Sequence, residues 1–226
     1  MRLALERHYH HFPVFHNLPD KRIQEILENA FCRKYHKGQI LFMTEDPRDR
    51  IYFSLSGYIK LSEMNEDCSS QFLMYLKPYS MFPYVGLFQD KFYRFSAEAV
   101  TDIEVLYIAT ATFERLVQND PMALINLIKT MGDKVYKHEV RIQKLTQVHA
   151  SDRVRHLIGF LMQDIGEKTD SADFCIPCPI TTTDLAKMSG TSRETVSHVL
   201  QEYKAAGKLD ISHKIITIKD PAFFLT

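Results

Sequence analysis

Residues 121–149 contain the feature that most restricts how this chain can fold, an apolar seam that advances in alternating steps of four and three residues. Its members are Leu124, Ile128, Met131, Val135, His138, Ile142, Leu145 and His149. A seam of this period, held for more than three heptads, predicts one long helix that begins near Pro121 and pairs with a second helix. A helix that packs on its own domain is the alternative, and it would carry a broader apolar stripe.

We expect two copies of the chain to pair along this helix, with the seam residues from Ile128 to Leu145 at the contact. His138 is unusual at a seam position. It either fixes the register or responds to pH, or it is a polar residue that the interface tolerates.

The residues before this helix form short β-rich runs separated by turn formers. The runs cover residues 40–42, 51–55, 58–61, 72–76 and 104–108. Many short strands at this spacing favour a closed or sandwiched β unit over roughly residues 20–110. Asp20 is expected to cap a short helix that continues to Ala30.

The residues after the seam predict two further groups of helices. The first helix is expected from Arg153 to about Ile165, capped by Ser151 or Asp152. A pair of short helices follows. The first starts after Thr181 or Thr182, and Asp184, three residues beyond Thr181, is expected to be the acid of a capping box. Gly190 is expected to end this helix with a positive φ, and Ser192 to cap the second helix. Buried faces would come from Ala186, Val196, Val199 and Leu200. This pattern is typical of a helix-turn-helix.

A β pair at residues 209–211 and 215–218, with a turn at 212–214, completes a winged helix. The second short helix would enter the major groove, where side chains of its first turns meet base edges. We expect base contacts from Arg193, Glu194, Ser197 and His198. We expect phosphate contacts from Thr182, Thr183, Ser192, Thr195, His213 and Lys214.

Charge does not mark the winged-helix region as a nucleic-acid binder. The 226-residue chain is neutral, with 28 basic and 28 acidic residues. Residues 150–226 carry nine Lys and Arg against ten Asp and Glu, which is a formal charge of −1. DNA binding must therefore depend on local placement and on helix N-termini, with strong salt dependence and modest non-specific affinity.

Composition places the chain among soluble globular proteins of one or two domains, since 45% of its residues are apolar and 25% are charged. No window approaches the roughly 20 apolar residues of a membrane helix. Residues 1–10 lack the apolar core of a secretory signal. Four cysteines without such a signal fit a reducing cytoplasm.

These features together resemble the Crp/Fnr family of bacterial transcription regulators over nearly the whole length. The matching segments are residues 37–42, 51–61, 86–88, the long helix, and residues 192–198. The resemblance implies an α+β protein with three parts: a cyclic-nucleotide-binding-like β-roll (1–120), a dimerisation helix (121–149) and a winged helix-turn-helix (150–226). It also implies a cytoplasmic homodimer, not an enzyme, that binds a palindromic site on double-stranded DNA and often contacts RNA polymerase.

Departures from the family pattern bear on the effector. Members that bind cyclic AMP carry Gly-Glu where this chain has Pro83-Tyr84, and an arginine for the cyclic phosphate where it has Phe95. Arg94 is one residue away and on the other face of a strand. We therefore expect no tight cyclic-AMP binding in the usual pose. The candidates for an effector pocket, which either line an apolar cavity or fill the roll, are Phe82, Tyr84, Phe88, Arg94, Phe95 and Ser96.

The candidate reader helix also departs from the pattern, because both subgroups usually carry arginine where His198 stands. The departure therefore concerns the base that the His198 side chain would contact. The chain is similar to a Firmicute branch that includes arginine-deiminase regulators, which likewise carry Phe-Pro before the Leu-Phe segment.

Cysteine chemistry supplies the competing function. Oxygen-sensing members hold an iron–sulfur cluster through an N-terminal cysteine group, whereas this chain has only Cys32 before residue 60. We expect no cofactor and no metal. Cys175 and Cys178 have the spacing of a redox disulfide or of half a zinc site, and they also fit two partly buried structural thiols. The second hypothesis is therefore a thiol-disulfide oxidoreductase or redox-switched protein.

Overall fold

The computed structural model describes residues 7–64, 70–169 and 173–225. The described residues form two compact units, one of residues 7–64 and 76–136 and the other of residues 70–75, 137–169 and 173–225.

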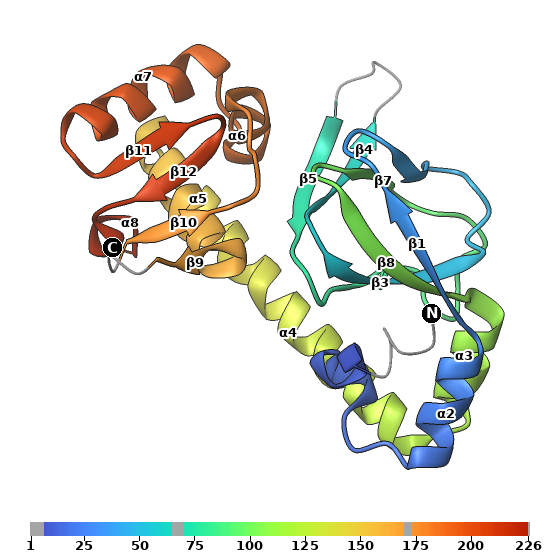
Figure 1. The fold of residues 1–226 in the computed structure, drawn as a ribbon. Helices are drawn as coiled ribbons and strands as arrows, with labels where there is room; N and C mark the ends of the chain where they lie inside the picture. The colour runs from blue at the N-terminus through green and yellow to red at the C-terminus, as the bar shows by residue number, and fades with distance from the viewer. Residues whose placement is uncertain (1–6, 65–69, 170–172, 226) are drawn as a thin grey trace. The chain divides into compact units, whose positions relative to one another are not determined.

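Two antiparallel sheets form the β-roll of the first part of the chain (Figure 1). In spatial order the strands of one sheet are β1 (Ala30–Tyr35), β8 (Ile103–Ala109), β3 (Arg50–Ser56) and β6 (Met81–Phe82). The strands of the other are β2 (Ile40–Phe42), β7 (Ser96–Ala99), β4 (Ile59–Met64) and β5 (Ser70–Leu76). All five β-rich runs predicted from the sequence are strands, but β1, β6 and β7 were not predicted.

Alternation along β3 places its side chains in two different cores. Ile51, Phe53 and Leu55 pack in a cluster with the helical segments that cover this sheet. Those segments are η1 (Tyr9–His11), η2 (Pro13–Phe15), α2 (Asp20–Glu28) and α3 (Thr110–Gln118). The expected cap at Asp20 is wrong, because Pro19 precedes the first turn and Asp20 already lies in the helix, which ends at Glu28.

The long helix α4 (Pro121–Leu145) begins where the sequence predicts, and Asp120 caps it by accepting hydrogen bonds from the amides of Met122 and Ala123, both at 3.0 Å. It ends at Leu145, four residues short of the expected His149. The Thr146 hydroxyl donates to the Gln143 carbonyl at 2.7 Å, which satisfies a group that further helix would have used.

The second unit contains the winged helix (Figure 1). Its helices are α5 (Ala150–Ile165), α6 (Thr182–Ser189), α7 (Arg193–Ala205) and α8 (Pro221–Leu225). Its sheet has the order β11 (Leu209–Ser212), β12 (Ile215–Ile218), β10 (Phe174–Ile176) and β9 (Glu167–Lys168). α5 starts earlier than expected, with His149 as its N-cap instead of Ser151 or Asp152.

A glycine allows two helices of this unit to approach closely. A Cβ atom on Gly159 of α5 would collide with the carbonyl oxygen of Phe224 in α8. The short C-terminal helix can therefore pack directly on α5. None of the helices in the described ranges combines the length and the apolar character that crossing a membrane requires.

Candidate nucleic-acid interface

Local hydrogen bonds fix the two helices of the helix-turn-helix as the sequence predicts. The Thr181 hydroxyl accepts from the Asp184 amide at 3.0 Å, and the Asp184 carboxylate accepts from the Thr181 amide at 3.2 Å. Gly190 ends α6 with φ at +60°, and Ser192 caps α7 by accepting from the Thr195 amide at 3.1 Å. These three predicted helix ends are confirmed.

Burial along α7 separates an inner face from an outer one. Val196, Val199 and Leu200 are buried, as predicted. The four candidates for base contact, Arg193, Glu194, Ser197 and His198, are all exposed. An exposed polar row on the first turns of the second helix is the arrangement that a major-groove reader requires.

Two of the four candidates have partners within the helix. The Glu194 carboxylate accepts hydrogen bonds from its own backbone amide and from the Ser192 hydroxyl, which hold its pKa below the ordinary value. It is therefore an anion at neutral pH and can accept a hydrogen bond from cytosine N4. His198 Nδ1 lies 3.5 Å from Glu202 Oε1. Glu202 is a neighbour that the sequence analysis missed, although its spacing of four residues indicated it.

The candidates for phosphate contact lie around the reader helix and on the wing. Ser192 and Thr183 are exposed, whereas Thr182 and Thr195 are half-buried. The wing turn consists of His213 and Lys214, both exposed and both with positive φ, at 50° and 68°. Two successive residues of this conformation form the tight hairpin turn that suits a twisted β pair.

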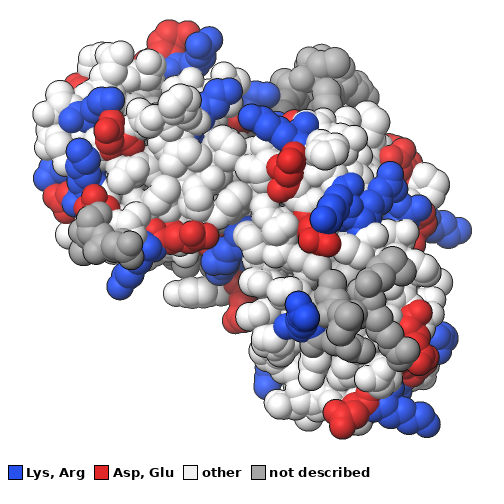
Figure 2. All heavy atoms as spheres, viewed as in Figure 1, with Lys and Arg blue, Asp and Glu red and all other residues white. Residues whose placement is uncertain are grey.

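Internal ion pairs neutralise part of the basic charge of this unit. Lys204 pairs with Asp210 at 2.7 Å, and Lys208 pairs with Asp220 at 2.8 Å. Figure 2 shows acidic and basic side chains interspersed on the face in view.

Comparisons with known proteins agree with this geometry. A family model for the cyclic nucleotide-binding domain matches residues 32–120, and one for the Crp-like helix-turn-helix domain matches residues 152–223. The chain belongs to the Crp/Fnr family of transcription regulators. Both of these parts are present, so the chain is a DNA-binding transcription regulator of the Crp/Fnr type.

Individual relatives match over most of their length. The HTH-type transcriptional regulator ArcR of Staphylococcus epidermidis is 29% identical over 201 residues, which cover 88% of this chain and 87% of that protein. ArcR of Staphylococcus aureus (strain Newman) is 27% identical over 198 residues, covering 88% and 84%. The structure of FixK2 from Bradyrhizobium japonicum has the same fold, with a TM-score of 0.74 at 19% identity, covering 87% of this chain and 96% of that one.

The Crp/Fnr β-roll of this chain places the effector candidates in different environments. Phe82 is fully buried, whereas Phe88 is 40% exposed. Arg94 is exposed and pairs with Asp90, with Nη2 at 3.0 Å from Oδ1, and this pair lowers the pKa of Asp90. Ser96 Oγ accepts from the Thr44 amide at 2.9 Å.

The remaining two candidates differ as well. Tyr84 is half-buried, packs against the helix-covered core cluster, and has Lys134 Nζ 5.6 Å from its ring centre. Phe95 is half-buried.

Aromatic side chains fill the inner face of the roll. The Phe42 and Tyr93 rings stack with centres 3.8 Å apart, and Tyr52 stacks on Phe82 at 5.4 Å. All four are at most 5% exposed. The Tyr93 hydroxyl donates to the Arg50 carbonyl at 3.0 Å, and burial raises the pKa of Tyr93 to about 12. This packing favours filling of the roll over an apolar cavity lined by these residues.

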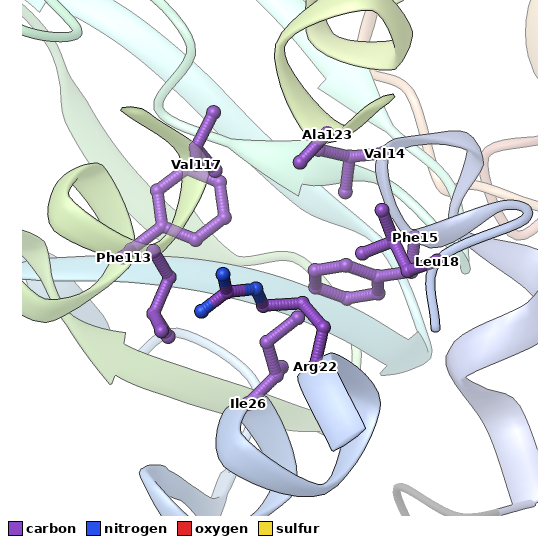
Figure 3. A pocket seen from close by; sticks show the side chains of 9 residues that line it. Val14, Phe15, Leu18, Arg22, Ile26, Phe113, Val117 and Ala123 are labelled. Atoms are coloured by element: carbon purple, nitrogen blue, oxygen red, sulfur yellow. The ribbon is translucent and has the colours of Figure 1, made fainter. Parts of the chain in front are cut away.

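A small cavity lies elsewhere, between η2, α2, α3 and the start of α4 (Figure 3). Its lining is apolar except for Arg22, which pairs with Glu25 at 2.6 Å and with Asp120 at 3.3 Å. Its volume is about 10 Å³, room for about one water molecule. It is too small for a nucleotide.

The cysteine pair lies in and just after β10, which pairs with β12 on one side and with β9 on the other. Cys175 is half-buried in β10 opposite Thr217, and Cys178 is fully buried. Burial, followed by the charge of Glu167, raises the pKa of Cys175. A redox-active thiol needs the opposite shift, toward the thiolate. Within the described part of the chain, no cluster of three or more His, Cys, Asp or Glu side chains could hold a metal ion.

The long helix carries two apolar faces. Ala123 and Leu127 are buried in the core cluster, and Leu124 and Met131 pack partly against it. Seam residues Ile128, Val135 and Ile142 are 68%, 57% and 63% exposed, and the neighbouring Ile125 and Tyr136 widen this strip. His138 is half-buried, and the side chain of Leu145 lies outside the described residues.

The capping box gives a first prediction. Thr181→Ala removes the hydroxyl that accepts from the Asp184 amide and donates to its carboxylate at 2.6 Å. We expect the free energy of unfolding to fall by about 1 kcal/mol. Denaturant titration followed by circular dichroism measures this, with exposed Thr183→Ala as the matched control. A loss for Thr181→Ala no larger than the control's would contradict the cap.

Proposed function

We propose that the chain is a homodimeric, sequence-specific transcription regulator whose helix α7 reads a palindromic operator. The observation that carries the proposal is an exposed row of polar side chains on the first turns of α7, namely Arg193, Glu194, Ser197 and His198. The turn before this helix is fixed by Gly190 at the end of α6 and by the Ser192 cap of α7. Arginine bonds guanine bidentately, glutamate accepts from cytosine, and serine suits either role. Thr182, Thr183, Ser192, Thr195, His213 and Lys214 fix the register on phosphates.

A second copy of the chain is the partner that best fits the exposed face of α4. Ile128, Val135 and Ile142 recur every seven residues along it. This is the spacing of a two-helix seam, and a partner helix would remove the apolar surface of these side chains from water. Two-fold pairing makes the operator a palindrome with half-sites about one helical turn apart.

The regulator acts in the cytoplasm on double-stranded DNA and contacts RNA polymerase there. Its effector is not cyclic AMP in the usual pose. Arg94, the arginine beside the family's phosphate position, pairs with Asp90, and aromatic side chains occupy the inner face of the roll. No iron–sulfur cluster or other cofactor takes part, and the chain has no enzymatic activity.

Calorimetric titration with cyclic AMP tests the effector proposal. We expect no heat of binding at nucleotide concentrations up to about 100 μM, since a buried phosphate needs a charge-assisted donor. Cyclic GMP serves as a matched nucleotide. Binding of cyclic AMP with a dissociation constant in the low micromolar range, abolished by Arg94→Gln, would contradict the proposal.

Thiol chemistry tests the competing oxidoreductase. Because the pKa of Cys175 is raised, less of its thiol is ionised at neutral pH than in a free cysteine, and its reaction with iodoacetamide should accelerate only at higher pH. We expect Cys175 to be alkylated more slowly than free cysteine at pH 7. We also expect Cys175→Ser to leave the DNA affinity unchanged. Fast alkylation, or loss of DNA binding on mild oxidation that Cys175→Ser prevents, would favour the redox function.

Capture of genomic fragments tests the proposed function itself. Full-length protein is mixed with sheared DNA of its source organism at fixed salt, and bound fragments are sequenced. We expect a few strongly enriched fragments that lie upstream of coding regions. The double variant Arg193→Ala, Ser197→Ala should still bind genomic DNA, but no fragment should be enriched over the others. Equal recovery of all fragments by the unaltered protein would overturn the proposal.

A further inference from the structure

The Arg153 side chain, in the first turn of α5, joins two segments that are distant in the sequence. Its Nη1 donates to the carbonyls of Gln147 and Val148, both at 3.0 Å. Its Nε donates to the Ser189 carbonyl at 3.0 Å, and its Nη2 donates to the Gly190 carbonyl at 3.3 Å. One guanidinium thus holds the connector between α4 and α5 and the C-terminal end of α6.

Electrostatics explains the direction of this side chain. A cation in the first turn of a helix opposes the helix dipole, whereas the carbonyls at the end of α6 carry partial negative charge that attracts a cation. Arg153 is half-buried and bonds four acceptors from two segments. The planar fork of arginine reaches them from three nitrogens, whereas lysine offers only one.

The segments that Arg153 holds lead directly to the reader helix. Ser189 and Gly190 are followed after one residue by Ser192, the N-cap of α7. Near the other end of α7, the Tyr203 hydroxyl donates to the Ser151 carbonyl at 3.2 Å, also in the first turn of α5. The turn that precedes the reader helix and Tyr203 near the helix's other end are therefore both bonded to the first turn of α5, which the connector enters.

The last part of α4, which precedes the connector, is also bound to α5. Lys137 in the last part of α4 pairs with Asp164 of α5 at 2.5 Å, and the Arg141 guanidinium lies 5.9 Å from the centre of the Phe160 ring. Between these contacts and Arg153, residues 146–149 are the part of the path with no helical hydrogen-bond ladder. A change in their backbone would alter two of the four acceptors of Arg153.

We propose that Arg153 is a positioning residue that makes the placement of α7 depend on the conformation of connector 146–149. The proposal rests on the proposed function, because it concerns the helix that would read the operator. A conformational change that reaches the connector would alter operator affinity through this guanidinium. Contacts to phosphate elsewhere, and with them non-specific affinity, would change little.

Arg153→Lys tests the proposal in the full-length protein, since it keeps the charge and removes the fork. Arg155→Lys is the matched control, because Arg155 is a half-buried arginine of the same helix whose guanidinium lies 3.4 Å from Asp152. Two quantities are measured at fixed salt: the ratio of affinities for an enriched duplex and its scrambled version, and amide hydrogen exchange of the peptides covering 146–150 and 189–193.

We expect Arg153→Lys to lower the affinity ratio about tenfold or more while non-specific affinity stays within about threefold. Exchange should accelerate in both peptides together, and Arg155→Lys should change neither quantity. An unchanged ratio, a parallel fall in both affinities, or faster exchange in only one peptide would overturn the proposal. If the unaltered protein prefers no duplex, the proposed function fails, and the exchange of the two peptides still decides whether Arg153 couples them.

Discussion

Val135→Glu is expected to convert the protein from a dimer to a monomer in solution. Val135 is 57% exposed in the middle of the α4 strip, between Ile128 and Ile142. In a paired helix the substitution would bring two carboxylates together in an apolar seam, and burying unpaired like charges costs several kcal/mol. Sedimentation equilibrium at micromolar concentration would show the mass of one 26.3 kDa chain instead of two.

Loss of the dimer should also weaken DNA binding. A palindrome is bound through two linked reader helices, so a monomer loses the gain from simultaneous engagement, about 100-fold or more. Lys129→Glu is the control, because it introduces the same side chain about 100° around the helix from Ile128. An unchanged mass for Val135→Glu, or equal dissociation of both variants, would contradict pairing along this face.

Arg193→Ala is expected to reduce operator affinity about 10- to 100-fold and to relax the preference at one base pair of each half-site. Arg193 is exposed at the first position of α7, directly after the Ser192 cap. A bidentate contact to guanine accounts for a discrimination of this size. Fluorescence anisotropy with duplexes that vary each position in turn measures both effects.

Lys214→Ala serves as the contrast to Arg193→Ala. Lys214 lies exposed in the wing turn. We propose that it contacts phosphate and not base edges. We expect Lys214→Ala to weaken binding to all duplexes about equally. The slope of log affinity against log salt concentration should become shallower by about one. Loss of base preference in Lys214→Ala, or equal losses across all duplexes in Arg193→Ala, would reverse the two assignments.

Helix ends in the reader motif were predictable because they depend on residues close in sequence. Thr181 with Asp184, Gly190 and Ser192 each satisfy backbone groups within four positions. The end of α4 was predicted four residues too late. The seam pattern continues to His149, but the Thr146 hydroxyl and the Arg153 guanidinium take up carbonyls there. Periodicity carries no signal for a contact of that kind.

The β-roll shows the same distinction. The five apolar runs were predicted as strands, whereas β1 was missed because its pairing with β8 joins residues more than 70 positions apart, such as Cys32 and Leu106. The sequence indicated that Arg94 is out of place for a cyclic phosphate, and its pairing with Asp90 at a spacing of four agrees with that. The stacking of Phe42 on Tyr93 could not be predicted from the sequence and is known only from the three-dimensional structure.

Selection of bound duplexes from a random pool, with reduced full-length protein at fixed salt, tests most directly whether α7 reads DNA as part of a homodimer. We predict enrichment of a palindrome whose half-sites lie about one helical turn apart, with preferences at the positions that Arg193 and Glu194 would contact. Enrichment of a single, unrepeated site, or of no sequence at any protein concentration, would contradict it.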